Sequence, residues 1–166
     1  MKYAEQPGVG VSVLVDASPT AMWELVSDVT VPPSFDNECV RTEWEDAPDG
    51  PALGATFRGY NRHPGLGWEW DVECRVTRFD EGREFGWRVT SDGGGAAEWW
   101  FTVEPVGDGG SRLWFHATMG PGFSGLSPAI EQMPDQEAQI VANRLGEWTT
   151  NMTTTIEGIK ALAEAR

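Results

Sequence analysis

Hydrophobic and polar positions follow two different periods along the chain. In residues 9–15, and again from about residue 38 to residue 118, apolar residues recur at every second position, and after residue 134 they recur at every third or fourth. The first period is typical of half-buried β-strands, and the second is typical of an amphipathic helix. The pattern therefore predicts a β-sheet followed by one long helix.

The two-residue period predicts seven strands, at Val9–Val15, Cys39–Trp44, Ala55–Arg62, Trp68–Phe79, Arg83–Ser91, Ala97–Glu104 and Ser111–Thr118. The last six are separated by runs of Gly, Asp and Pro, which favour turns. Strands joined by such short separators are antiparallel neighbours. We therefore expect six successive antiparallel strands after a first strand that stands apart in the sequence.

Two helical regions flank these strands. Ser18 is a good N-cap and Pro19 suits a first helical position, so a short amphipathic helix is predicted there; residues 31–35 end it and leave room for one further turn. The long helix is predicted from Pro134 to the end of the chain, although Ser127-Pro128 starts either a separate first turn or the long helix itself, and Pro134 indicates a break. Its apolar stripe comprises Val141, Leu145, Trp148, Met152, Ile156, Ile159 and Ala163.

The alternation also predicts which side chains point toward the long helix. The strand that begins at Trp68 separates apolar from charged residues cleanly, and an earlier strand brings Gly59, Asn61 and His63 to the same inward face. The inward positions, taken together, include Phe57, Trp68, Trp70, Val72, Cys74, Val76, Phe85, Trp87, Trp99, Phe101, Leu113 and Phe115. The sheet should therefore have one strongly aromatic face with a small polar region.

Composition narrows the class of protein. The 166 residues suit one domain spanning 1–166, and the net charge of −14 argues against binding to nucleic acid or to an anionic membrane surface. Two isolated cysteines suit neither a disulfide framework nor a metal site, so we expect reduced thiols in a cytoplasmic protein. We find no signal peptide pattern and no apolar run of about 20 residues that would insert into a membrane. Nine tryptophans and seven phenylalanines indicate an aromatic core or an aromatic pocket.

Several segments, in this order, resemble those of the START-like, Bet v 1-like superfamily, and specifically its bacterial polyketide cyclase/dehydrase and lipid-transport branch. The segments are Asp16-Ala17-Ser18-Pro19 with Trp23, Gly54 to Arg62 (GATFRGYNR), Trp68-Glu69-Trp70, Phe85-Gly86-Trp87-Arg88-Val89, Val103-Glu104-Pro105 and Gly109 to Leu113 (GGSRL). The resemblance covers nearly the whole chain. It implies an α+β helix-grip fold, in which a curved seven-stranded antiparallel sheet wraps around the C-terminal helix, with two short helices between the first two strands.

The resemblance implies a cofactor-free cavity for a small hydrophobic molecule. Aromatase/cyclases of this branch use pocket arginine and tyrosine groups, but here Cys74 stands where the arginine is expected, and strand parity turns both Tyr3 and Tyr60 outward. That departure argues against cyclase chemistry. Polar candidates for orienting a ligand, or for acid–base work, are Asn61 and His63. The alternative is that Asn61 satisfies a backbone group and that His63 lies in a solvated turn.

The remaining candidate site residues are aromatic or apolar. The ligand-binding candidates are Phe57, Asn61, Trp70, Cys74, Trp87, Trp99, Phe101, Phe115, Trp148 and Met152, each of which could instead be core. Phe123 and Leu126 lie in the glycine-containing stretch from Gly120 to Pro128, which should lie at the cavity mouth, and are candidate gate residues.

Three functions follow from these patterns. The first is binding of a lipid-like, aromatic or polyketide-like molecule between sheet and helix. The second is a cyclase or dehydratase that acts on such a ligand through Asn61 and His63. The third is an interaction module without a pocket, whose aromatic residues are all core. Exposed patches and a homodimer that takes up no ligand would favour this third function.

Overall fold

The computed structural model describes residues 1–166. Its strands are β1 Gly8–Val15, β2 Cys39–Asp46, β3 Thr56–Arg62, β4 Glu69–Asp80, β5 Glu84–Val89, β6 Ala97–Val106 and β7 Gly110–Met119. Its α-helices are α1 Pro19–Val26, α2 Ser127–Gln132 and α3 Glu137–Glu164, and short 3-10 turns lie at Tyr3–Glu5, Pro32–Ser34 and Pro134–Gln136.

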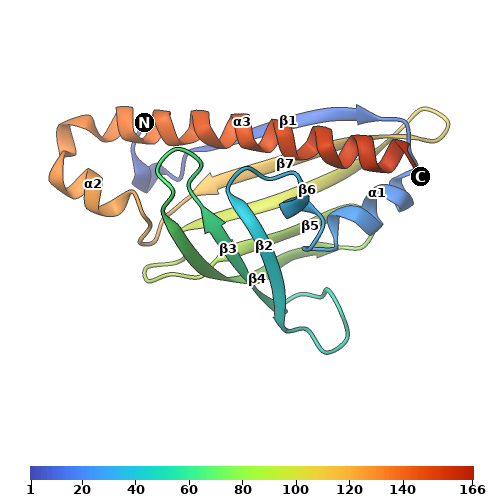
Figure 1. The fold of residues 1–166 in the computed structure, drawn as a ribbon, viewed down its shortest axis with the longest axis horizontal. Helices are drawn as coiled ribbons and strands as arrows, with labels where there is room; N and C mark the ends of the chain where they lie inside the picture. The colour runs from blue at the N-terminus through green and yellow to red at the C-terminus, as the bar shows by residue number, and fades with distance from the viewer.

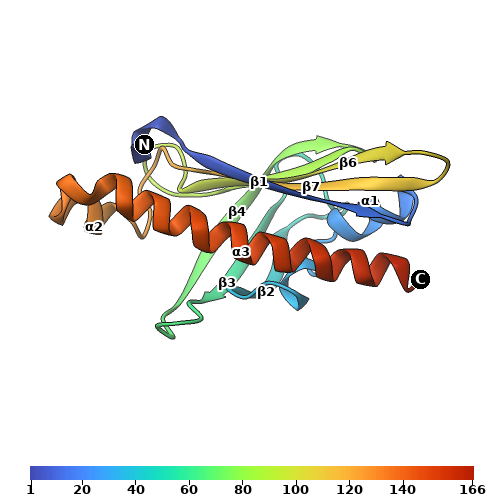
Figure 2. The same ribbon diagram turned by 90° about the horizontal axis from the view of Figure 1, so that it is seen from above.

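The seven strands form one antiparallel sheet in the order β1-β7-β6-β5-β4-β3-β2. Each of β2 to β7 pairs with the next strand in the sequence, as the short separators predicted, while β1 closes the far edge by pairing with β7. Figure 1 shows α3 running alongside β1 for most of the length of the molecule, and Figure 2 shows the sheet curving around that helix. The predicted helix-grip fold is confirmed.

The first helix begins where its capping residues predicted. The Ser18 hydroxyl accepts a hydrogen bond from the Ala21 backbone N–H at 3.1 Å, and Pro19 occupies the first helical position. The helix ends at Val26, and the adjacent Pro32 and Pro33 support only a single 3-10 turn. These two short elements lie between β1 and β2, as expected.

The long helix begins later than predicted. α2 is a separate helix, Pro134 opens a 3-10 turn, and α3 itself starts at Glu137. All seven residues of the predicted apolar stripe are buried. Gly158 has a packing reason, because a Cβ there would lie 2.3 Å from the ring of Phe35. The absence of a side chain at Gly158 therefore lets Phe35, which follows the Pro32–Ser34 turn, pack closely against α3.

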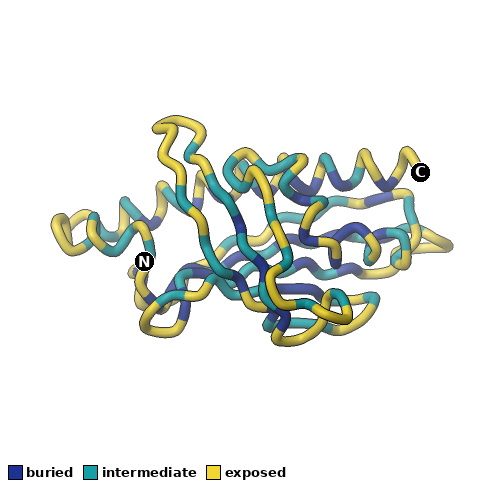
Figure 3. The backbone as a smooth tube through the Cα atoms, turned by 60° about the horizontal axis from the view of Figure 1, so that its bottom comes forward, coloured by how far each residue is buried: buried dark blue, intermediate teal, exposed yellow.

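The buried residues are concentrated toward one end of the molecule. α1 and the C-terminal half of α3 pack against β1, β6 and β7 around Phe101, Leu113, Ile156 and Ile159. Figure 3 shows buried backbone along the middle strands and exposed backbone at the hairpins. The α1 end of the sheet is therefore filled by side chains, whereas the N-terminal half of α3 faces a less densely packed region.

The fourth strand starts one residue later than predicted. β4 begins at Glu69, and Trp68 lies in the hairpin before it with 68% of its surface exposed. The backbone carbonyl of Trp68 accepts the His63 N–H and closes that hairpin. Trp68 nevertheless lies on the inward side, where it lines the cavity described below.

Candidate functional site

A cavity of about 960 Å³ lies between the inward face of the sheet and the N-terminal half of α3. The helix contributes Ile140, Asn143, Arg144, Glu147, Trp148 and Asn151 to its lining. Strands β2 to β7 contribute the opposite wall. The cavity volume is at the upper end of the range of about 300–1,000 Å³ for small-molecule sites.

Aromatic rings lie on both the sheet side and the helix side of the wall. Trp99 and Trp148 meet across the space between sheet and helix with ring centroids 4.5 Å apart, and Phe57 packs edge-on against Trp87 at 5.7 Å. Trp70, Trp87 and Trp99 point inward but keep part of their surface exposed. If the tryptophan side chains filled the space between the sheet and α3, these three rings would be fully buried. The aromatic face therefore encloses a cavity as well as a core.

The inward polar residues of β3 lie on this wall. Gly59 leaves a gap in it, because it has no side chain. The side chain of Asn61 makes one long hydrogen bond, from Nδ2 to the Gly59 carbonyl at 3.5 Å. Its amide is therefore weakly engaged within the protein and free to meet a ligand. At another part of the wall the Ser91 hydroxyl is buried without a hydrogen-bond partner, a situation that costs about 1–3 kcal/mol.

Both cysteines are free thiols on the cavity wall. Burial raises the pKa of Cys39 to about 12, and the nearby Asp36 carboxylate adds to the effect. Burial also raises the pKa of Cys74 strongly. A thiol must lose its proton to act as a nucleophile, so neither cysteine is prepared for covalent catalysis.

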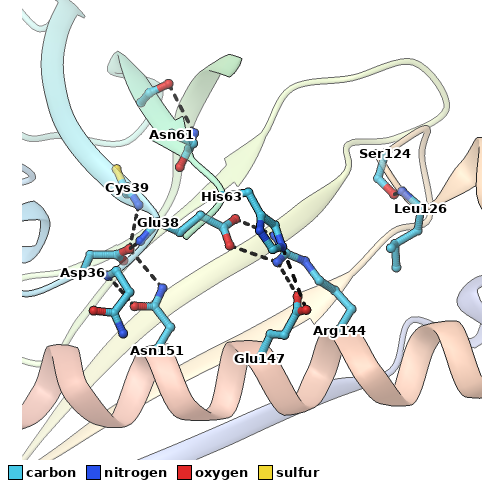
Figure 4. A network of polar contacts seen from close by, with 12 residues as sticks. Asp36, Glu38, Cys39, Asn61, His63, Ser124, Leu126, Arg144, Glu147 and Asn151 are labelled. Atoms are coloured by element: carbon cyan, nitrogen blue, oxygen red, sulfur yellow. Dashed lines mark hydrogen bonds and ion pairs between the residues drawn. The ribbon is translucent and has the colours of Figure 1, made fainter. Parts of the chain in front are cut away.

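An ion pair spans the gap between α3 and the start of β2 (Figure 4). Arg144 binds Glu38 with both ends of its guanidinium, at 2.5 Å from Nη2 and 2.9 Å from Nη1, and Nη1 also donates to Glu147 at 2.8 Å. Only 18% of the Arg144 side chain and 17% of the Glu38 side chain are exposed. Burial alone would lower the pKa of Arg144, but the bonds to Glu38 and Glu147 outweigh it and raise that pKa. The guanidinium is thus charged, and both of its Nη atoms are engaged.

A second polar link joins the same two segments. The Oδ1 atom of Asp36 accepts hydrogen bonds from Asn151 Nδ2 at 3.0 Å and from the Glu38 and Cys39 backbone N–H groups. Burial nevertheless raises the pKa of Asp36, because these donors only partly replace water. Together with the Arg144 pair, this link fixes the segment before β2 against α3.

His63 lies in the turn directly after β3, next to these charges. Its Nδ1 accepts the backbone N–H groups of Gly65 and Leu66, both at 3.2 Å, so the neutral ring carries its proton on Nε2. That Nε2 lies 3.9 Å from Glu147 and on the cavity lining. The ring therefore shapes its turn through one nitrogen and presents the other to the cavity. The second histidine, His116, is stacked between two tryptophans on the outer face of the sheet, as its parity predicted.

The loop between β7 and α2 forms one rim of the cavity. Phe123 and Leu126 both line the cavity, and the Phe123 ring is 59% exposed. The backbone of Phe123 donates to the Asp92 carbonyl at 2.8 Å, which holds this loop against the β5–β6 hairpin. Figure 4 shows Leu126 across the cavity from His63.

Tyr3 was wrongly predicted to point outward. It belongs to the 3-10 turn that precedes β1, so strand parity does not apply to it. The side chain is buried and lines the cavity, and its hydroxyl donates to the Gly122 carbonyl at 2.7 Å. Burial raises the pKa of this phenol. Tyr3 thus supports the loop that carries Phe123.

The structure places most predicted ligand-binding residues on the cavity wall, but not all of them. Those on the wall are Phe57, Asn61, Trp70, Cys74, Trp87, Trp99, Phe115 and Trp148. Phe101 and Met152 are fully buried in the core and do not line the cavity. Phe101 stacks behind Phe115 at 4.2 Å, and Met152 lies one helical turn beyond Trp148, where the core has already filled the space.

The sequence analysis missed Glu38 and Arg144. A signal was present for Arg144, which is three residues after Val141 and four before Trp148 and therefore shares their face of the helix. A lone charge on an apolar stripe needs a buried partner. Glu38 precedes β2 and carries no periodic signal, so only the fold could identify it as that partner.

No cluster of three or more His, Cys, Asp or Glu residues is placed to hold a metal ion. None of the helices is both long and apolar enough to cross a membrane.

Fold and cavity together define a helix-grip protein with a cavity between sheet and helix that is lined in large part by apolar and aromatic side chains. Residues 6–157 match the model of the family described as polyketide cyclase / dehydrase and lipid transport, and the chain belongs to that family. No protein with a curated description matches the sequence.

Solved structures agree with this assignment. A polyketide-cyclase-like protein from Corynebacterium glutamicum (Cgl2372) is 25% identical, with a TM-score of 0.66 over 95% of this chain and 91% of that one. The ZhuI aromatase/cyclase from Streptomyces sp. R1128 is 15% identical, with a TM-score of 0.69 over 96% and 94% of the two chains. A major latex-like protein from Panax ginseng is 8% identical, with a TM-score of 0.63 over 95% and 97%. The last two similarities concern the fold alone.

Proposed function

We propose that this protein binds a small hydrophobic molecule, lipid-like, aromatic or polyketide-like, in the cavity between its sheet and α3. The observation that carries the proposal is a cavity of about 960 Å³ whose inward tryptophans remain partly exposed. Apolar ligand surface buried there would contribute roughly 25 cal/mol per Å². Asn61 and the unpartnered Ser91 hydroxyl supply the few polar contacts that would orient a ligand.

The size of the cavity sets the expected affinity. Drug-sized ligands gain about 0.3 kcal/mol per non-hydrogen atom, so a ligand of about 25 such atoms gains about 7.5 kcal/mol. This corresponds to a dissociation constant in the micromolar range. The description of the family names both polyketide cyclases and lipid transport, and either role requires that a hydrophobic molecule be bound.

Native mass spectrometry of the protein purified from its own host tests the proposal. We expect a co-purifying apolar metabolite at close to one per chain, released on denaturation and then identified. A Gly59→Leu variant, in which the gap on the cavity wall is filled, is the matched control and should carry less of it. An empty wild-type protein whose tryptophan fluorescence also ignores a panel of lipids and polyphenols would refute the proposal.

A second candidate function is a cyclase or dehydratase acting on such a ligand. The observation that favours it is the placement of the proton-bearing Nε2 of His63 on the cavity lining, 3.9 Å from Glu147. A His63→Asn variant keeps a hydrogen-bond acceptor for the turn but removes this proton donor. Turnover of an aromatic polyketide analogue that is lost in His63→Asn, while binding persists, would favour catalysis. Binding without turnover in the wild-type protein would leave the carrier function alone.

A further inference from the structure

The basic groups that line the cavity are Arg144 and His63. A ligand carboxylate that entered the cavity would normally pair with the arginine, because the guanidinium fork matches a carboxylate with two parallel hydrogen bonds. That fork is already occupied. Both Nη atoms bind Glu38, and Nη1 also binds Glu147.

Carboxylates outnumber these basic groups along the lining. Glu38 and Glu147 bind the arginine, and Asp36 lies beside Glu38. At the exposed edge Glu69 adds a further carboxylate, while that of Asp71 is paired with Arg58 outside the lining. Asp36 is engaged by Asn151 and by backbone N–H groups but has no cationic partner among its bonds. The side of the cavity that carries the charged groups is therefore negative overall.

A ligand carboxylate would meet one of two costs in this environment. It could displace Glu38 from Arg144, which would leave a largely buried glutamate without its partner. Otherwise it would remain without a cationic partner near the carboxylates of Asp36 and Glu147, which repel it. A hydroxyl or carbonyl group meets neither cost, and an ammonium group is attracted to the surplus carboxylates.

We infer that Glu38 decides the charge of the ligand: by occupying Arg144 it makes the cavity accept uncharged and ammonium-bearing amphiphiles and reject carboxylates. The inference rests on the proposed function, since it concerns the same cavity. It also assigns Glu38 the role of a specificity-determining residue. Removing its charge should free donors on Arg144 and turn the arginine into a carboxylate-binding group.

The test compares three probes that share one naphthalene body and differ only in their head group. These are 2-(1-naphthyl)ethanol, 2-(1-naphthyl)ethylamine and the anion of 1-naphthaleneacetic acid. Each is used at neutral pH to displace the uncharged fluorophore N-phenyl-1-naphthylamine. For the wild-type protein we expect the alcohol and the amine to displace the fluorophore. The acid should be weaker than the alcohol by about tenfold or more, the effect of one unpaired like charge a few ångströms away.

The variant Glu38→Gln keeps the length of the side chain, and Glu147 still pairs with Arg144. In this variant the acid should gain about tenfold in affinity, while the alcohol changes by less than about threefold. The double variant Glu38→Gln/Arg144→Gln should lose that gain, because the gain depends on the freed guanidinium. Glu157→Gln, on the exposed face of α3, makes the same change in net charge and should leave all three affinities as in the wild type.

The outcomes separate the inference from the proposed function. Wild-type protein that binds the acid as tightly as the alcohol overturns the charge selectivity but leaves the hydrophobic cavity standing, and this comparison needs no variant to fold. A Glu38→Gln protein that folds and still rejects the acid overturns the role of Glu38. A wild-type protein that binds neither the fluorophore nor any probe overturns the proposed function, and the inference falls with it.

Discussion

Gly59 offers a way to fill the cavity without disturbing the fold. It lies in the middle of β3 on the cavity wall. A Cβ atom built there would have Val72, Asn61 and Cys39 as its nearest neighbours, at 3.5, 3.9 and 3.9 Å, which are ordinary van der Waals distances. The backbone does not adopt the left-handed conformation that would require glycine. Gly59→Leu should therefore place its side chain in the cavity without strain.

The magnitudes follow from these contacts. Glycine in a strand costs roughly 0.5–1 kcal/mol relative to alanine, so the substitution should raise the free energy of unfolding by about 1 kcal/mol. For a chain of this size that corresponds to a rise of about 2–4 °C in Tm. A leucine that excludes two or three ligand CH₂ groups, at about 0.8 kcal/mol each, should cost about 2 kcal/mol of binding, or about 30-fold in affinity.

Thermal unfolding followed by circular dichroism, together with titration of N-phenyl-1-naphthylamine, measures both effects. Gly86→Ala provides the contrast, because a Cβ there would lie 2.5 Å from Trp100 Cβ and 2.8 Å from the Trp99 carbonyl oxygen. That variant should lose stability. A Gly59→Leu protein that unfolds at a clearly lower temperature than the wild type would show that the space is not there. Unchanged affinity for the fluorophore would show that the ligand binds elsewhere.

Three further predictions test other parts of the structure. Cys39 and Cys74 should both resist the thiol reagent DTNB at pH 8 in the folded protein, because with a pKa of about 12 only about one Cys39 thiol in ten thousand is ionised at that pH. Both thiols should react at once in guanidinium, and rapid reaction in the folded protein would contradict their burial. Met152→Ala should lower the free energy of unfolding in urea by about 2–5 kcal/mol but leave the affinity for the fluorophore unchanged, since Met152 lies outside the cavity. Weaker fluorophore binding with no loss of stability would show that Met152 contacts the ligand. Burial alone would raise the pKa of Glu98, but its bonds with Arg78 and Arg88 outweigh burial and lower that pKa, so Glu98→Gln should reduce the free energy of unfolding by about 1–2 kcal/mol at pH 7. This stabilisation is present above the unfolded pKa and is lost as the pH falls through the folded pKa, so wild type and variant should become equally stable in acid below the usual glutamate range. A constant difference in stability across that range would refute the assignment.

Local patterns were sufficient to predict most of the fold. A side chain on a strand or helix faces the core or the solvent according to a fixed period, so alternation located all seven strands, and the helical period located the buried stripe of α3. Capping and turn chemistry are local as well, and Ser18 and Pro134 marked helix boundaries for that reason. Where the backbone leaves regular structure the same reasoning failed, as Tyr3 shows.

The candidate site depended on contacts between distant parts of the chain. The alternation identified inward side chains, but it could not tell which of them face empty space, and so Phe101 and Met152 could not be separated from Trp99 and Trp148. That separation is made by α1 and the C-terminal half of α3, which fill only one end of the sheet.

What the sequence determined by itself was the order of elements, the aromatic inward face and the acidic charge of the chain. What only the tertiary structure decided was the open cavity and the pairing of Glu38 with Arg144 across 106 positions of sequence. The physical reason is that periodicity reports on each element alone. A cavity, and the charge that a ligand meets inside it, exist only between elements that the folded chain has brought together.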